Sequence, residues 1–178
     1  MARVRGFAAR GIVVALSMAL AGCVSARITT LSAFSSADGH FSVTVPGTMV
    51  ESTSTGSGPF AAATIHSFLY DEPGGPRFVV IYGDADPGFI ASMSTDAALD
   101  QFEASNVSAT KGRQVSERHL TISGLPGREQ HIVGPSGSYL FRMVVAGNRL
   151  YSFSVKGADS QVQQADAIVY LDSFAVTP

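Results

Sequence analysis

The fold of this chain is decided by SYLFRMVVAGNRLYSFSVKG, residues 138–157, where two alternating segments flank a short polar turn. Apolar side chains recur at every second position: Tyr139, Phe141, Met143 and Val145 in the first segment, then Tyr151, Phe153 and Val155 in the second. Alternation of this kind is typical of a β-strand with one buried face. An odd loop, such as Ala146-Gly147-Asn148 with a bulge, would place both apolar sets on one core. With any other loop, the two apolar sets would lie on opposite faces of the sheet, and both faces would have to be covered.

Further segments around this hairpin predict more strands. They are FSVTV (41–45), AAATIHSFLY (61–70), RFVVIYGD (77–84), RQVSERHLTIS (113–123) and GREQHIVG (127–134). A helix is expected to begin at Asp96, with Leu99 facing inward and Glu103 facing outward, and a second helix is expected after Ser160. Because the strands are joined mainly as hairpins, we expect an α+β fold. Its antiparallel sheet would have about six to seven strands, with two main helices packed on it.

The N-terminus has the parts of a secretory signal peptide, residues 1–22. A basic segment containing Arg3, Arg5 and Arg10 precedes an apolar run over residues 11–21. This run is about half as long as the roughly 20 residues of a membrane-spanning helix. It ends in LAGC (20–23), which resembles the lipobox of bacterial lipoproteins. We therefore expect cleavage between Gly22 and Cys23 and a diacylglyceryl thioether on Cys23. The alternative is an ordinary buried cysteine that follows the signal by coincidence.

A lipidated Cys23 would place the protein on a membrane of the bacterial cell envelope. Each buried methylene of an acyl chain contributes about 0.8 kcal/mol, so two chains anchor a protein stably without a membrane-spanning helix. Val24, and not aspartate, follows Cys23, which favours the outer membrane in bacteria that have two membranes. We expect a lipidated, flexible tether over residues 23–37 and one globular domain over residues 38–178.

Charge and cysteine content narrow the function classes. The chain has 12 basic and 14 acidic residues, and three of the basic residues belong to the signal. The acidic balance of the remaining chain does not favour nucleic-acid binding. Cys23 is the only cysteine, so we expect neither a disulfide nor a free thiol in the domain. No cofactor is expected.

Four short motifs resemble a bacterial domain family of the PsbP-like fold. They are DGHFSVTVP (38–46), GLPGREQ (124–130), GNRLYSFSV (147–155) and YLDSF (170–174). The superfamily includes the extrinsic P protein of photosystem II and a nuclear Ran-binding import factor. This resemblance, which spans about residues 38–176, implies an antiparallel sheet between helices. It also implies a role in binding or assembly in place of catalysis, and it brings no set of catalytic residues.

Recognised catalytic motifs are absent from the sequence. There is no G-x-S-x-G elbow, phosphate-binding G-x-x-x-x-G-K-[ST] loop or H-E-x-x-H helix. GDADPG (83–88) has carboxylates at alternate positions, but it lacks the twelfth-position glutamate of a calcium loop and is interpreted as a turn. We expect a protein that is not an enzyme. A hydrolase triad assembled from distant serines, histidines and acids is the remaining enzymatic alternative.

One polar cluster is a candidate metal or ligand site. His119 and His131 lie on strands that are expected to pair around the GLPG loop, and Leu120, Ile122 and Ile132 are expected to share the opposite face. With Glu129 beside them, the two imidazoles could offer ligands to zinc or copper. The alternative is a pair of solvated histidines, with Arg128, Glu129 and Arg149 forming ion pairs on neighbouring strands.

Two function classes follow from these patterns. The first is a lipid-anchored, non-catalytic interaction or assembly module that binds an envelope protein. The second is an accessory protein of the envelope that binds a small ligand or a metal. An exposed apolar patch would favour the first class, and a closed pocket with convergent polar groups would favour the second.

Replacement of the lipobox cysteine tests the anchor. Cys23→Ser should release the protein from the membrane fraction or leave the signal uncleaved, because serine offers no thiolate for lipid transfer. Mass spectrometry of the N-terminal peptide from the native host should show S-diacylglyceryl Cys23. An unmodified Cys23 there would contradict the prediction.

Overall fold

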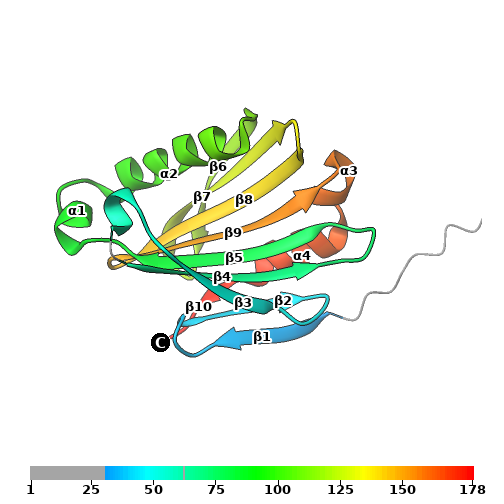
Figure 1. Ribbon diagram of the computed structural model, residues 1–178, viewed down its shortest axis with the longest axis horizontal. Coiled ribbons are helices and arrows are strands. Elements are labelled where there is room, and N and C mark those ends of the chain that lie inside the picture. Colours follow the sequence, from blue (N-terminus) through cyan, green and yellow to red (C-terminus); the bar gives the residue numbers. More distant parts are fainter. Residues whose placement is uncertain (1–30, 62) are drawn as a thin grey trace, which may run out of the picture.

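The computed structural model describes residues 31–61 and 63–178. Seven strands form one antiparallel sheet (Figure 1). Their order across the sheet is β3 (Val50–Thr55), β4 (Thr64–Asp71), β5 (Arg77–Asp84), β9 (Arg149–Gly157), β8 (Gly137–Ala146), β7 (Leu125–Gly134) and β6 (Arg113–Ile122). The expected antiparallel α+β fold is confirmed.

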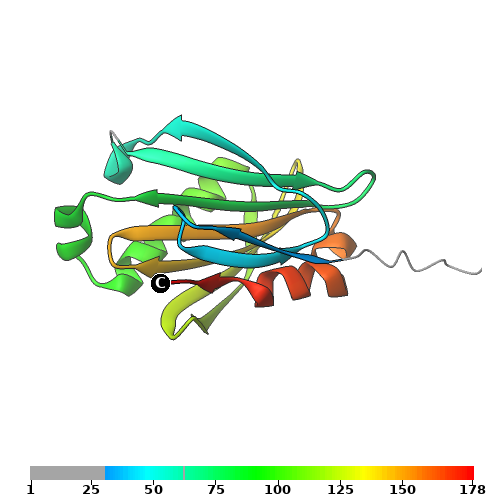
Figure 2. The same ribbon diagram turned by 90° about the horizontal axis from the view of Figure 1, so that it is seen from below.

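Both faces of this sheet are covered, by different elements (Figures 1 and 2). The inner face carries a three-stranded sheet, β1 (Ser32–Ser36), β2 (Phe41–Val45) and β10 (Ala175–Val176), together with α3 (Asp159–Val162) and α4 (Ala165–Ser173). On the outer face, α2 (Thr95–Thr110) packs against β7 and β8. The short helices η1 (Gly58–Phe60) and α1 (Pro87–Ala91) lie in the connections before β4 and after β5.

The length of the β8–β9 turn explains why both faces of the sheet have to be covered. Ala146 lies opposite Arg149, so the loop is the two-residue Gly147-Asn148 and not the expected three-residue loop. Gly147 has φ +64°, a conformation that glycine adopts without strain. Directly opposed residues share a face, and Val144 is opposite Tyr151. Met143 therefore points to the outer face, away from Tyr151.

The larger core fills the space between the inner face and the smaller sheet. Phe153 is fully buried on the inner face, and its ring stacks on Phe174 at a centroid distance of 4.0 Å. Phe174 in turn stacks on Phe41 of β2 at 5.6 Å. Tyr170 of α4 closes the core from the helical side, where its hydroxyl donates to the Val79 carbonyl at 2.7 Å. Burial raises the pKa of Tyr170, so this hydroxyl keeps its proton.

The outer face has a smaller core beneath α2. Leu99 of α2 is fully buried against Met143 and Val145 of β8, and Phe102 and Leu150 pack at its edge. Glu103, expected to face outward, is instead only 7% exposed. Its outward placement is therefore a wrong prediction. The cause is helical spacing, because Glu103 lies four residues after the buried Leu99 and therefore shares its face of α2.

Part of the expected tether is folded. Residues 32–36 form β1, which pairs with the whole of β2 from Ser32 opposite Val45 to Ser36 opposite Phe41. The Phe34 ring packs on Phe68 at 5.4 Å and on Phe41 at 6.0 Å. Assigning residues 32–37 to a flexible tether was therefore wrong, because one aromatic side chain in a run of small residues is enough to join them to the core. No helix of the described residues is long and apolar enough to cross a membrane.

Truncation of Phe153 tests the larger core. In a fragment of residues 31–178, Phe153→Ala should lower the free energy of unfolding by about 3–5 kcal/mol, since it leaves a cavity beside Phe174. Urea unfolding would measure this loss. Val169→Ala is the control, because Val169 is 43% exposed on α4 and should lose less than about 0.5 kcal/mol. Equal losses in both variants would contradict this assignment of the core.

Candidate functional site

A charged and aromatic cluster occupies one end of the inner face. Arg149, the first residue of β9, lies opposite Asp84, the last residue of β5. The two side chains form a bidentate ion pair, with Nε donating to Oδ1 at 2.7 Å and Nη2 donating to Oδ2 at 2.8 Å. The remaining nitrogen, Nη1, donates to the Asp38 carbonyl at 2.8 Å. All three nitrogens of the guanidinium are thus held in a fixed orientation.

Tyr82 separates Arg149 from a histidine. The guanidinium carbon lies 4.7 Å from the centre of the Tyr82 ring, and the His66 imidazole stacks parallel to that ring at 4.6 Å. Tyr82 belongs to β5, with His66 on the neighbouring β4 and Arg149 on the neighbouring β9, so the two groups flank it from opposite sides. His66 Nδ1 is 2.8 Å from Glu51 Oε1 of β3. The cluster therefore crosses four strands.

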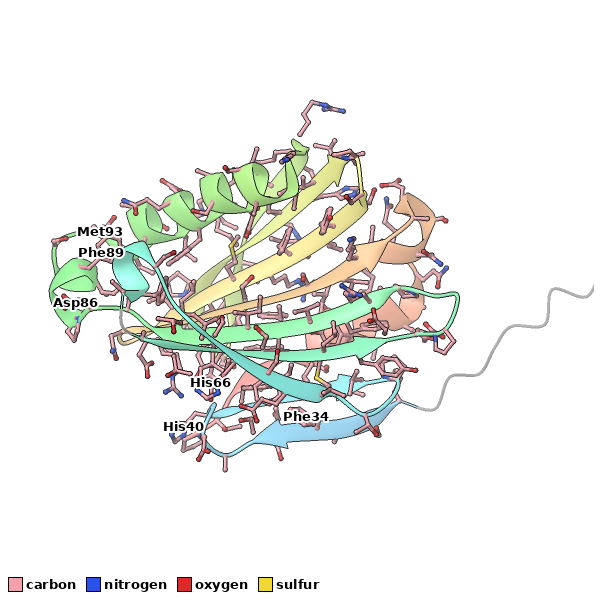
Figure 3. All side chains as sticks on the ribbon, in the orientation of Figure 1. Phe34, His40, His66, Asp86, Phe89 and Met93 are labelled. Carbon is pink, nitrogen blue, oxygen red and sulfur yellow. The ribbon has the colours of Figure 1, made fainter. Side chains whose placement is uncertain are left out.

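The β1–β2 turn borders this cluster on the side of the smaller sheet. Tyr151 donates its hydroxyl to the Gly39 carbonyl at 2.8 Å, which ties the turn to β9. His40 has φ +50° and places Nδ1 2.9 Å from the carbonyl oxygen of Pro178. His40 and His66 appear at the same end of the molecule in Figure 3. The site thus combines the large sheet, the first turn and the last residues of the chain.

Two open hollows meet at the Arg149–Asp84 pair. One, of about 400 Å³, is also lined by Asp38, Ala63, Thr64, His66 and Tyr82. The other, of about 310 Å³, is also lined by His40, Ala146, Asn148, Tyr151 and Val176. Small-molecule sites begin at about 300 Å³ and are usually enclosed. These shallow hollows, which we call the Arg149 surface, present fixed charges and polar atoms to an incoming group.

Asp84, Tyr82 and Tyr151 each keep one protonation state near neutral pH. The hydrogen bonds from Arg149 lower the pKa of Asp84, and burial raises the pKa values of Tyr82 and Tyr151. Asp84 is therefore charged and both tyrosines are neutral at neutral pH. Because the Asp84 pKa is lowered in the folded state, its contribution to stability is present above the unfolded pKa and is lost as the pH falls through the folded value.

The described residues offer little catalytic chemistry at this surface. His66 and Glu51 could act as a general base, but no hydrogen bond joins His66 to a hydroxyl among residues 31–61 and 63–178. Nor do those residues contain a group of three or more His, Cys, Asp or Glu side chains that could hold a metal ion.

The structure does not bring the predicted metal ligands together. His131 faces the inner side, where Nε2 lies 3.1 Å from Asp159 Oδ1, whereas His119 faces the outer side. Glu129 is held by Arg118 at 2.9 Å and by Arg142 at 2.7 Å. The predicted shared face of the two histidines was wrong, as was the predicted ion-pair set of Arg128, Glu129 and Arg149. The cause lies in Ile132, which was expected to face the same core as Leu120 and instead packs on the outer side.

A second polar cluster lies under α2. Arg128 is 3% exposed, and its Nη2 is 3.0 Å from Asp96 Oδ1 and 3.5 Å from Asp100 Oδ1. Its Nε lies 3.4 Å from Glu117 Oε1. Glu103 is buried nearby, and its Oε1 has no hydrogen-bond partner within the described part of the chain. Burial, followed by repulsion from Glu117, raises the pKa of Glu103 to about 7.

Comparisons with known proteins show the fold. No family model matches the chain, and no curated protein matches it. The solution structure of cyanobacterial PsbP from Synechocystis sp. PCC 6803 is similar, with a TM-score of 0.58 and 12% sequence identity. The match covers 88% of this chain and 98% of that chain. The PsbP-like fold implied by the four motifs is confirmed, and at this identity the likeness shows the fold alone.

Sequence reasoning missed the Arg149 surface. Its residues come from the β1–β2 turn, β4, β5, β8, β9 and β10 and from the connections before β4 and after β8, and no two of them form a recognised motif. One signal was available, since Asp84 and Arg149 end and begin strands that could be neighbours. Cys23 lies outside the described residues, so its lipidation remains a prediction.

The buried carboxyl group predicts a pH dependence. The pKa of Glu103 is higher in the folded chain than in the unfolded chain, so its stabilising effect is complete below the unfolded value near 4.5 and is lost as the pH rises through about 7. Glu103→Gln should therefore raise the free energy of unfolding at pH 8 by about 2 kcal/mol and change it little at pH 4.5. Urea unfolding at the two pH values measures this. Glu72→Gln makes the same exchange in the β4–β5 turn, at a carboxyl group that does not contribute to the pKa of Glu103, and it should show no such difference. Equal behaviour of the two variants would count against a buried Glu103.

Proposed function

We propose that this chain is a lipid-anchored lipoprotein of the bacterial cell envelope, with a domain that acts as a non-catalytic interaction or assembly module. The domain binds an envelope partner through the Arg149 surface. The observation that carries this proposal is the bidentate Arg149–Asp84 pair, which stands at the mouth of two open hollows with its guanidinium oriented by a third hydrogen bond. Fixed charges of this kind favour a specific partner over nonspecific association.

The direction of β1 supports display of this surface away from the membrane. The described chain enters β1 at Ser32 and leaves it toward Asp38 and His40, beside Arg149 (Figure 1). At about 3.3 Å per residue, the five residues of β1 separate the entry point from the Arg149 surface by about 16 Å. An anchor on Cys23 would therefore hold the opposite end of the domain and leave the Arg149 surface facing outward.

The fold is consistent with this role. Its resemblance to PsbP-like domains implies binding or assembly, and the resemblance brings no catalytic residues. The acyl chains on Cys23 would keep the module at one membrane, where restriction to a surface raises the effective concentration of a partner in the same envelope.

A second function is favoured by the size of the hollows. Volumes of about 400 and 310 Å³ can accept a small polar ligand, so the alternative is an accessory protein that binds such a molecule at the Arg149 surface. The openness of both hollows favours a macromolecular partner, which can cover them both together with the charged pair between them.

Matched removal of two similar ion pairs tests the interaction. The lipidated protein would be cross-linked to its neighbours in the native envelope, as wild type, Arg149→Ala and Arg77→Ala. Arg77 also forms an exposed pair with a facing aspartate, Asp71, but at the other end of β5, so its loss should leave the cross-linked partner unchanged. Arg149→Ala should reduce that cross-link by tenfold or more, as about 1.4 kcal/mol corresponds to a tenfold change.

Circular dichroism of both variants would control for folding. Equal cross-linking of Arg149→Ala and wild type would contradict partner binding at this surface. Native mass spectrometry showing a small molecule that is bound to wild type and lost in Arg149→Ala would support the alternative function.

A further inference from the structure

No segment of residues 31–61 and 63–178 covers the edge strand β3. All six of its residues are exposed, and Val50, at 66%, is the most exposed of the large apolar side chains in the described part of the chain. β3 pairs with β4 without a bulge and has no proline or basic residue. In Figure 2 it forms the outer border of the sheet. Natural proteins usually protect such edges, because the unpaired backbone groups can bind another strand.

The opposite edge of the same sheet shows that protection. β6 carries Arg113, Glu117, Arg118 and His119, and its pairing with β7 is interrupted between Gln114 and Ser116. Charged side chains and bulges are two ways of preventing edge-to-edge pairing. In the smaller sheet, β10 has only two residues, and β1 directly follows residues outside the described range. Among these edges β3 is thus the longest one without protection.

The backbone of β3 has a defined set of free groups. The Gly56 N–H donates to the Ala63 carbonyl at 2.8 Å, so this residue directs its backbone toward β4. In an antiparallel pair the direction alternates with every residue. Glu51, Thr53 and Thr55 therefore direct their N–H and C=O groups outward, away from β4. This gives three residues with hydrogen-bonding groups ready for another strand.

We propose that two copies of this chain associate through antiparallel pairing of their β3 strands about a two-fold axis at Thr53. A two-fold axis normal to the sheet keeps each face on its own side, so paired residues must share a face. Thr53 then lies opposite Thr53 of the other copy, and Glu51 lies opposite Thr55 of the other copy. In this register, the outward backbone groups of Glu51, Thr53 and Thr55 all pair with the same three residues of the other copy. A two-fold axis at Ser52 would pair Glu51 with Thr53 and leave Thr55 without a partner among these three residues.

The side chains of β3 are complementary to a second copy. The Thr53 pair and the Ser52–Ser54 pairs bring hydroxyl groups together, which is favourable across strands. Glu51 is the only charged residue of β3, and in this register it faces a threonine and not the other Glu51. It also keeps its contact with His66 of its own chain, so pairing leaves no carboxylate without a partner. The sheet would become continuous across the two copies.

A single introduced cysteine can report this register in the full-length protein. Cys23 is the only native cysteine and is the expected lipid site, so Thr53→Cys provides one free thiol per folded domain. The two-fold axis places the two thiols opposite each other, with Cα atoms about 5.5 Å apart, within the range of a disulfide. Mild oxidation of membranes should yield a disulfide-linked dimer. Val169→Cys, on an exposed surface of α4, should remain monomeric.

Charge at position 55 tests the same contact independently. In the Thr53→Cys background, Thr55→Glu places two carboxylates opposite each other twice, and it should reduce the dimer fraction about fivefold or more. Thr55→Lys places an ammonium group opposite Glu51 and should keep or increase the dimer. Thr55→Gln, which matches glutamate in size without its charge, should behave as threonine does. Absence of a Thr53→Cys dimer, or equal dimer fractions with glutamate and lysine at position 55, would overturn the proposal.

Discussion

The two-residue turn between β8 and β9 determines the architecture of this protein. With Gly147 and Asn148 as the whole loop, Val144 shares the inner face with Tyr151, while Met143 and Val145 point to the outer face. A one-residue change in register would move every side chain of one strand to the other face. Asn148 also anchors the turn, because its side chain and its carbonyl oxygen both bond to the backbone of Ala85, just beyond β5.

The same register creates the Arg149 surface. Arg149 directly follows the turn and reaches the inner face, where Asp84 and Tyr82 extend from the neighbouring strand. Tyr151 of β9 ties the β1–β2 turn of the smaller sheet to the large sheet. This contact brings the Asp38 carbonyl to the Arg149 guanidinium. The smaller sheet and its neighbouring helices cover the centre of the inner face and leave its end open. The result is a surface with fixed polar groups and little enclosed volume. We propose that a partner binds at this surface.

The local sequence pattern predicted which segments form strands, but it predicted poorly which face of the sheet their side chains occupy. Alternation identified the strand of Phe41, Val43 and Val45 and the strands of the central hairpin, since each strand carries its own period. The face of Ile132 depended on whether a helix covers the outer side, which is not encoded within that strand, and the predicted histidine site failed for this reason. Phe34 was assigned to a tether because a single aromatic residue has no period. The Arg149 surface joins segments more than 100 residues apart and could not be predicted from their separate sequences.

The register of β8 and β9 can be measured directly by nuclear magnetic resonance on residues 31–178. Side-chain contacts between Val144 and Tyr151, together with contacts between Met143 and Leu99 of α2, are the predicted result. They would establish the two-residue turn, the double cover of the sheet and the inward placement of Arg149 together. Contacts between Met143 and Tyr151 would indicate a three-residue loop and a single shared core. That result would contradict both the fold and the Arg149 surface described above.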